Sequence, residues 1–129
     1  EREQRPNRPG QGAGDVGAVK ELIKRLKQGW LGNVFVEGSR TDTGELLPVQ
    51  AGAALVVRRA EVPVIPCIIQ GSFEAWPRRQ KLPRPHPVAV MYGPPLNVEG
   101  LKANEVTQLI QRTLHEMMAE LRRIDGRIA

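Results

Sequence analysis

The stretch of sequence that decides the fold reads VFVEGSRT and occupies residues 34–41. It begins with three apolar residues and then changes abruptly to Glu37 and Gly38, as a buried strand does when it ends at the edge of a sheet. Ligands bind at the C-terminal ends of the strands in α/β sheets. The stretch therefore predicts a strand over 33–36 that delivers polar groups to a binding site.

The polar half of this stretch has the chemistry of an anion site. Gly38 lets the backbone approach a ligand closely and offers an unobstructed N–H, while Arg40 has a planar fork of donors that matches two phosphate oxygens. Thr41 adds a hydroxyl, and Glu37 can orient Arg40 or accept a hydroxyl of the ligand. The residues that we expect to bind phosphate are Glu37, Gly38, Ser39 and Arg40. The same tetrapeptide also fits a surface turn closed by an Arg–Glu ion pair, and its spacing alone favours that surface turn.

On both sides of this stretch the chain alternates between helical and extended patterns. Apolar residues recur at helical spacing after Asp15, the predicted N-cap, and the helix is expected to end before Gly29. The later segments are a helix over 51–59, a strand over 63–70, a loop over 76–87, a strand over 88–92 and a helix over 104–124. This order predicts an α/β fold in which a layered sheet is flanked by helices.

Several positions within these segments carry specific expectations. Prolines 63 and 66 confine the 63–70 strand to a sheet edge, or place its pairing mainly after Pro66. Cys67 lies in an apolar run and is expected to be a small buried residue. The last helix has one apolar stripe, formed by Val106, Leu109, Ile110, Leu114, Met117 and Leu121.

The charge of the chain predicts an anionic partner. Lys and Arg exceed Asp and Glu by 19 minus 14, which gives a net charge of +5. Lipid head groups, nucleic acid and phosphorylated metabolites all fit this balance. An aromatic content of 4% disfavours single-stranded nucleic acid, which is usually bound by stacking on aromatic side chains. The apolar runs are too short to span a bilayer, so membrane contact is expected to be peripheral.

Four ordered blocks resemble the lysophosphatidic acid and glycerol-3-phosphate acyltransferases. The segment Glu37-Gly-Ser-Arg40 resembles their Glu-Gly-Thr-Arg motif, and residues 44–48 with Gly52 resemble the turn and helix that follow it. Residues 62–67 with Gly71 are similar to the family's Val-Pro-Ile-Val-Pro-Val block. Residues 92–96 resemble its Gly-x-Pro-Ile segment. The blocks cover roughly residues 15–121.

The resemblance implies acyl transfer in phospholipid biosynthesis, from a thioester of coenzyme A or acyl carrier protein to a lysophosphatidate or glycerol-3-phosphate-like acceptor. It gives Glu37, Gly38 and Arg40 a role in binding the acceptor's phosphate. It implies a peripheral place on the cytoplasmic side of a membrane, with no cofactor beyond the acyl donor as co-substrate, no metal and no nucleic acid. It also implies the fold of the C-terminal half of the glycerolipid acyltransferase domain.

The histidine that would act as the base in such an enzyme is not recognised in this chain. The family uses His-x-x-x-x-Asp before its phosphate motif, whereas His86 and His115 both follow it. His115 and Glu120 are spaced like that motif, but on a helix they point about 140° apart. His86 lies between two prolines and is expected to be an exposed loop residue. We therefore expect no catalytic residue here and an inactive isolated chain.

The sequence departs from the family in other places. Val36 stands where the family has proline, and residues 49–51 replace a Lys-rich segment. A second arginine-bearing block that binds phosphate normally lies earlier in the family. Arg2, Arg5 and Arg8 are candidate remnants of it, and none of them can be assigned to it. Because the chain begins with Glu1 and has no signal segment, we expect a cut or processed edge, with residues 1–14 as a flexible Pro/Gly/Arg-rich arm and 15–129 as a partial acyltransferase-like domain.

Three hypotheses follow from these observations. The chain is the C-terminal portion of an acyltransferase, or a non-catalytic relative that binds lipid phosphate or an anionic membrane. The third, nucleic-acid binding through the Arg-rich arm, depends on charge alone. The four ordered blocks favour the first.

Overall fold

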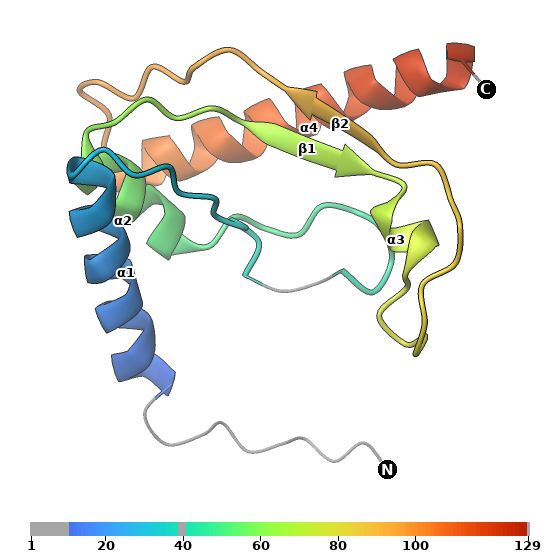
Figure 1. The fold of residues 1–129 in the computed structure, drawn as a ribbon. Coiled ribbons are helices and arrows are strands. Elements are labelled where there is room, and N and C mark those ends of the chain that lie inside the picture. Colours follow the sequence, from blue (N-terminus) through green and yellow to red (C-terminus); the bar gives the residue numbers. More distant parts are fainter. Residues whose placement is uncertain (1–10, 39–40, 129) are drawn as a thin grey trace.

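A long C-terminal helix and a pair of short strands organise the fold. The structure, a computed structural model, describes residues 11–38 and 41–128. Its elements are α1 (Gln11–Lys27), α2 (Ala51–Ala60), β1 (Cys67–Gln70), α3 (Ser72–Ala75), β2 (Ala89–Tyr92) and α4 (Ala103–Ile128). The two strands form one layer and α4 forms another, with α1 and α2 at one end (Figure 1). The α/β class predicted from the sequence is confirmed.

The strands pair in the antiparallel direction, and proline sets where the pairing begins. Cys67 lies opposite Tyr92 at the start of β1. Beyond the strands, the N–H of Gly93 donates to the carbonyl of Pro66 at 2.9 Å. Proline can accept in this way but has no N–H to donate. The prediction that pairing lies mainly after Pro66 is confirmed, and the strand is shorter than the predicted 63–70.

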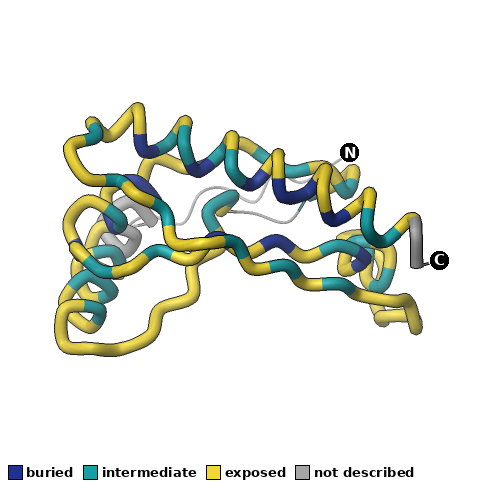
Figure 2. The backbone as a smooth tube through the Cα atoms, turned by 90° about the horizontal axis from the view of Figure 1, so that it is seen from above, coloured by how far each residue is buried: buried dark blue, intermediate teal, exposed yellow. Residues whose placement is uncertain are grey.

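The core lies between the inner face of this sheet and α4. Successive side chains of a strand point to opposite faces, so Ile68 is 3% exposed whereas Ile69 is 41% exposed. Buried residues line the sides of α4 and the strands that face each other (Figure 2). The buried cluster consists of Val49, Ala53, Ala54, Ile68, Val106, Ile110, Leu114, Met117, Met118 and Leu121. It confirms the predicted stripe on α4 at all but Leu109, which is half-buried.

The prediction that Cys67 is buried was wrong. The alternation along β1 places Cys67 on the same outward face as Ile69, and its side chain is exposed. The apolar run around Cys67 did not indicate which of the two faces packs against α4.

Helix α1 starts earlier than predicted and ends as predicted. It begins at Gln11, so the prediction of Asp15 as its N-cap was wrong. Residues 11–14, which were expected to belong to the flexible arm, are helical. Residues 1–10 of that arm lie outside the described residues. Once a helix has formed, each further residue adds a backbone hydrogen bond, even where glycine weakens the preference. At the other end Gly29 has φ +92°, and the N–H of Trp30 donates to the carbonyl of Arg25 at 3.1 Å. This is a glycine-terminated helix end of the Schellman type.

Residues 33–36 do not form the predicted strand. A strand is stabilised by a neighbouring ladder, and within residues 11–38 and 41–128 the sheet consists of β1 and β2, which pair with each other. Val34 and Phe35 are exposed accordingly, whereas Val36 packs against the core. Glu37 and Gly38 therefore follow an irregular segment instead of the predicted strand.

A tight turn after β1 leads into the short helix α3, which the sequence patterns did not predict. Gly71 has φ +92°, and a Cβ added there would lie 2.1 Å from the carbonyl oxygen of Pro87. Only glycine fits such an approach. The segment 76–87 beyond α3 has no helix or strand, which confirms the predicted loop.

None of the helices in the described parts of the chain combines the length and the apolarity that crossing a bilayer requires.

The two neighbouring isoleucines of β1 test the assignment of the sheet faces. Ile68→Ala should lower the free energy of unfolding by about 2–5 kcal/mol, because it leaves a cavity against α4. Ile69→Ala removes the same atoms from the exposed face and should cost less than about 1 kcal/mol. Urea unfolding of both variants measures the difference, and equal losses would contradict the assignment of the faces.

Candidate functional site

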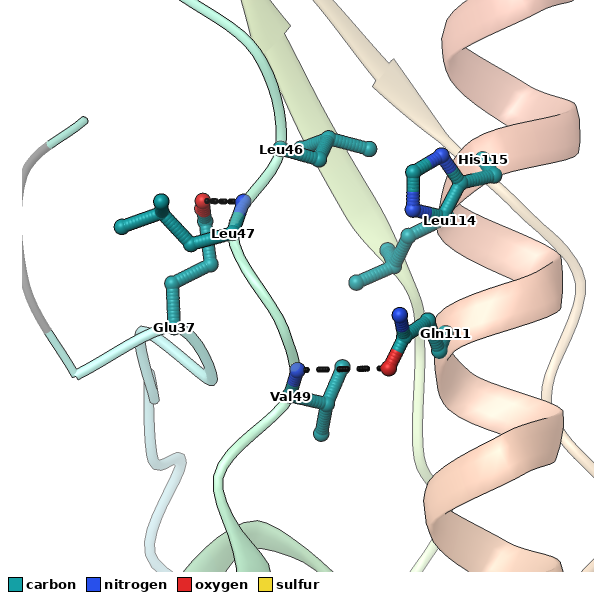
Figure 3. Close-up of a pocket in the computed structure, with 7 residues that line it drawn as sticks. All are labelled: Glu37, Leu46, Leu47, Val49, Gln111, Leu114 and His115. Atoms are coloured by element: carbon teal, nitrogen blue, oxygen red, sulfur yellow. Dashed lines mark hydrogen bonds between the residues drawn. The ribbon is translucent and has the colours of Figure 1, made fainter. Parts of the chain in front are cut away.

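The loop that carries the predicted phosphate-binding motif is closed at its base by two hydrogen bonds. The N–H of Gln50 donates to the carbonyl of Val36 at 2.8 Å. One step further out, the N–H of Leu47 donates to Oε2 of Glu37 at 2.7 Å (Figure 3). Residues 37–47 therefore leave and return at one place, as in a compact Ω-loop. We call residues 37–47 the motif loop.

Glu37 is tied to the loop's own backbone. Its carboxylate was predicted to orient Arg40 or to accept a ligand hydroxyl, and the structure places one of its oxygens on the Leu47 N–H. Hydrogen bonds to charged groups are worth about 1.5–3 kcal/mol. Ser39 and Arg40, two of the four predicted phosphate-binding residues, lie outside the described residues.

The backbone of Gly38 makes a turn, and its N–H is bonded within the chain. Its N–H donates to the carbonyl of Phe35 at 3.1 Å, so the prediction of an unobstructed N–H was wrong. Its φ of +70° is the feature that calls for glycine, and a Cβ added there would lie 3.1 Å from Cγ of Gln50. The glycine therefore makes the turn that opens the motif loop.

The turn that follows the motif is stabilised by its own hydroxyl groups and by an aromatic ring. Oγ1 of Thr41 accepts the N–H groups of Thr43 and Gly44, each at 3.2 Å. Gly44 has φ +86°, and a Cβ added there would lie 3.0 Å from the ring of Phe73. The far side of the motif loop thus rests on the segment after β1.

Two ion pairs join the motif loop to distant parts of the chain. Arg122 on α4 lies 3.4 Å from the carboxylate of Glu45, and Arg78 lies 3.7 Å from that of Asp42. All four side chains are well exposed, and such pairs contribute at most about 1 kcal/mol each. Sequence analysis did not identify Phe73, Arg78 or Arg122, because no local pattern indicates contacts made through the tertiary fold.

Beneath the motif loop lies a small hollow, shown in Figure 3. Its volume is about 10 Å³, roughly the space needed for one water molecule. Beside it, the N–H of Val49 and Oε1 of Gln111 are 3.5 Å apart. The hollow is lined by Glu37, Leu46, Leu47, Val49, Gln111, Leu114 and His115. It is too small for a glycerophosphate.

The two histidines lie in different parts of the fold, one in the 76–87 loop and one on α4. His86 is exposed in the 76–87 loop, as predicted, and its Nδ1 lies 2.8 Å from the carbonyl oxygen of Pro87. His115 borders the hollow from α4, while Glu120 forms an ion pair with Arg123. Within the described ranges, no three His, Cys, Asp or Glu side chains converge to hold a metal ion.

The α/β fold, with a motif loop that contacts α3 and α4, matches one class of proteins, the acyltransferases. The family model described as Acyltransferase matches residues 5–70. The crystal structure of the 1-acyl-sn-glycerophosphate (LPA) acyltransferase PlsC from Thermotoga maritima superimposes with a TM-score of 0.76 at 25% identity, over 81% of this chain and 44% of that one.

Relatives from plants and animals agree with this match. The 1-acyl-sn-glycerol-3-phosphate acyltransferase of Limnanthes alba is 26% identical over 81% of this chain and 37% of its own length. The 1-acyl-sn-glycerol-3-phosphate acyltransferase alpha of Ovis aries is 32% identical over 73% of this chain and 33% of its own length. The chain thus spans about a third of the length of these relatives. It belongs to the Acyltransferase family, and the resemblance found in its sequence is confirmed.

The bond between Glu37 and Leu47 can be tested directly. Glu37→Ala should speed hydrogen exchange of the Leu47 amide by about ten-fold or more, because a charge-assisted bond at the base of the loop is lost. Glu45→Ala, which removes only the exposed pair with Arg122, should leave that exchange rate within about two-fold. Amide exchange followed by NMR checks both, and an unchanged rate in Glu37→Ala would show that the carboxylate does not hold the loop.

Proposed function

We propose that this chain provides the acceptor-binding part of an acyltransferase of phospholipid biosynthesis. The acyl group would pass from a thioester of coenzyme A or acyl carrier protein to a hydroxyl of a lysophosphatidate or glycerol-3-phosphate-like acceptor. The observation that carries the proposal is the motif loop, which is closed by Glu37 and joined to α4 through Glu45. The names of the relatives, which are 1-acyl-sn-glycerol-3-phosphate acyltransferases, support the choice of acceptor.

In this proposal the residues of the motif have different roles. Arg40 offers its planar fork to two phosphate oxygens, and the hydroxyl of Ser39 provides a further donor. Gly38 makes the turn, since its N–H is already bonded to Phe35. Glu37 holds the base of the loop rather than the ligand. Arg40 therefore provides most of the affinity, and Glu37 keeps its segment in place.

The chemical step needs a base near the acceptor hydroxyl. When the acceptor hydroxyl attacks the thioester carbonyl, a base takes its proton and the thiolate leaves, and proton transfer contributes about 100- to 10,000-fold. His86 lies in the exposed 76–87 loop, and His115 lies on α4 below the motif loop. We propose that neither serves as the base and that the chain by itself binds acceptor without transferring acyl groups.

The same observations favour one alternative, a non-catalytic relative that binds lipid phosphate or an anionic membrane. The net charge of +5 and the position of both histidines after the motif are its basis. It shares the phosphate site with the first proposal and differs only in the chemistry.

Arg40 is the residue on which the phosphate site depends. Arg40→Ala should weaken binding of glycerol 3-phosphate by about 10- to 100-fold, the loss expected when a charged hydrogen-bonding partner is removed. Arg59→Ala, which removes an equal charge near the C-terminal end of α2, should change it less than about two-fold. Isothermal titration calorimetry of the 129-residue chain measures both, and equal affinity of the Arg40→Ala variant and wild type would rule out the proposed site.

An activity assay distinguishes binding from catalysis. The chain, mixed with an acyl-coenzyme A and lysophosphatidate, should release free thiol at the rate of the blank without protein, because on this proposal neither His86 nor His115 takes the proton of the acceptor hydroxyl. The assay follows the thiol with a chromogenic disulfide reagent. Thiol release that depends on the acceptor and is lost in His115→Gln would overturn the proposal that the chain lacks a base.

A further inference from the structure

A basic surface lies beside the motif loop, in the segment that follows α3. Residues 76–88 read WPRRQKLPRPHPV, with four Arg or Lys residues, no Asp or Glu, and four prolines. We call residues 76–88 the basic loop. Neither the motif nor the proposed acceptor site explains why the basic loop has this composition.

The shape of the basic loop is fixed by hydrogen bonds at its base. The indole N–H of Trp76 donates to the carbonyl of Gln80 at 3.0 Å. Arg84 donates twice to the α3 segment, from its backbone N–H to the carbonyl of Ala75 at 2.7 Å and from Nε to that of Glu74 at 2.8 Å. The prolines restrict the backbone further. The tip between these anchors, residues 78–83, is therefore held in a defined conformation.

The tip exposes apolar and cationic side chains together. Leu82 is 77% exposed and Trp76, at the base, is 45% exposed. Arg79 and Lys81 are also exposed and flank the tip. Indole and leucine side chains favour the interface of a bilayer, and each cation near an anionic surface adds about 1 kcal/mol of attraction. This combination fits an anionic lipid surface better than it fits a folded protein partner, for which a larger apolar patch is usual.

The position of the basic loop relates it to the acceptor site. Arg78 pairs with Asp42 of the motif loop at 3.7 Å, and Phe73, just before the basic loop, lies under Gly44. The chain also exposes Trp30 and Leu31, which follow α1. Figures 1 and 2 place the end of α1 and the segment after α3 at opposite ends of the molecule. If the basic loop is the part of the protein that contacts the membrane, the motif loop beside it lies close to the membrane surface. An acceptor that enters from the membrane then reaches the motif loop first.

We propose that the basic loop docks this protein on an anionic phospholipid bilayer, so that the motif loop faces the lipid head groups. The proposal rests on the proposed function only in the reason for docking, which is that the acceptor is a membrane lipid. Docking itself needs no acceptor and no residue of the phosphate motif.

Vesicle co-sedimentation tests the surface with a matched pair of triple variants. The loop variant Arg79→Gln, Lys81→Gln, Leu82→Ser and the control variant Lys24→Gln, Lys27→Gln, Leu31→Ser each lose two cations and one exposed leucine. On vesicles of phosphatidylcholine with about 30% phosphatidylglycerol, the loop variant should partition about 30-fold more weakly than wild type. The control variant should stay within about three-fold, and circular dichroism should show the same helix content in all three proteins.

The tryptophans give a second readout that does not depend on affinity. The chain has two tryptophans, so Trp30→Phe leaves Trp76 as the fluorophore. Its emission should shift to the blue when the anionic vesicles are added, and it should not shift with vesicles of pure phosphatidylcholine. Equal vesicle binding by the loop variant and wild type, or an unmoved Trp76 emission, would overturn the docking surface. Tighter loop-dependent binding to RNA than to the anionic vesicles would overturn it as well.

The two proposals fail in different experiments. Soluble glycerol 3-phosphate should bind the loop variant as tightly as wild type, because residues 79–82 are not in the phosphate site. Arg40→Ala should lose that ligand and still bind acceptor-free anionic vesicles within about three-fold of wild type. If wild type binds the vesicles through the basic loop but does not bind glycerol 3-phosphate, the docking surface stands and the acceptor proposal is wrong.

Discussion

Burial of the apolar stripe of α4 is the constraint on which the rest of the structure depends. Val106 at the start of the stripe is completely buried, and Leu121 near its end is almost so. The stripe contacts α2 and both strands, so its burial fixes three elements at once. The face that α2 turns toward it carries Ala53 and Ala54, whose small side chains let the helices approach closely. Because α2 starts at Ala51, its placement also fixes the base of the motif loop.

The packing of α2 against α4 determines where the base of the motif loop lies. Gln50, directly before α2, bonds to Val36, and Val49 beside it belongs to the buried cluster. Glu37 then closes the loop one step further from the core. Val36 and Glu37, on an irregular segment, are thus bonded to backbone N–H groups on either side of the buried Val49. The base of the motif loop therefore has a defined place although residues 33–36 form no strand.

Local patterns in the sequence predicted the helices well and the remaining elements less well. The period of α4 gave its buried stripe, and α2 was predicted to within one residue of its end. The strand expected at 33–36 was wrong because pairing depends on a neighbour that is remote in sequence. Cys67 was assigned to the wrong face because an apolar run does not reveal the phase of its alternation. The early start of α1 was missed because glycines disfavour a helix without preventing one.

For the candidate site, the sequence indicated which residue types to consider but not which contacts they make. The Glu-Gly-Ser-Arg tetrapeptide and its neighbours indicated an anion site in a known family, and the family is confirmed. The bond between Glu37 and Leu47 spans ten residues, and the pair between Arg122 and Glu45 spans 77. Such contacts follow from the tertiary fold, and no local signal in the sequence predicts them.

The energetics of the motif loop bear on how it would bind a phosphate. Ordering the backbone of a free loop costs about 1–2 kcal/mol for each residue, and a ligand that had to do this would bind weakly. The exposed pairs made by Arg78 and Arg122 are too weak to offset that cost. The Glu37 bond and the backbone bond at Gln50, both near the core, are better placed to hold the base of the loop. On the proposed function, a change at Glu37 would therefore alter phosphate affinity without touching the ligand.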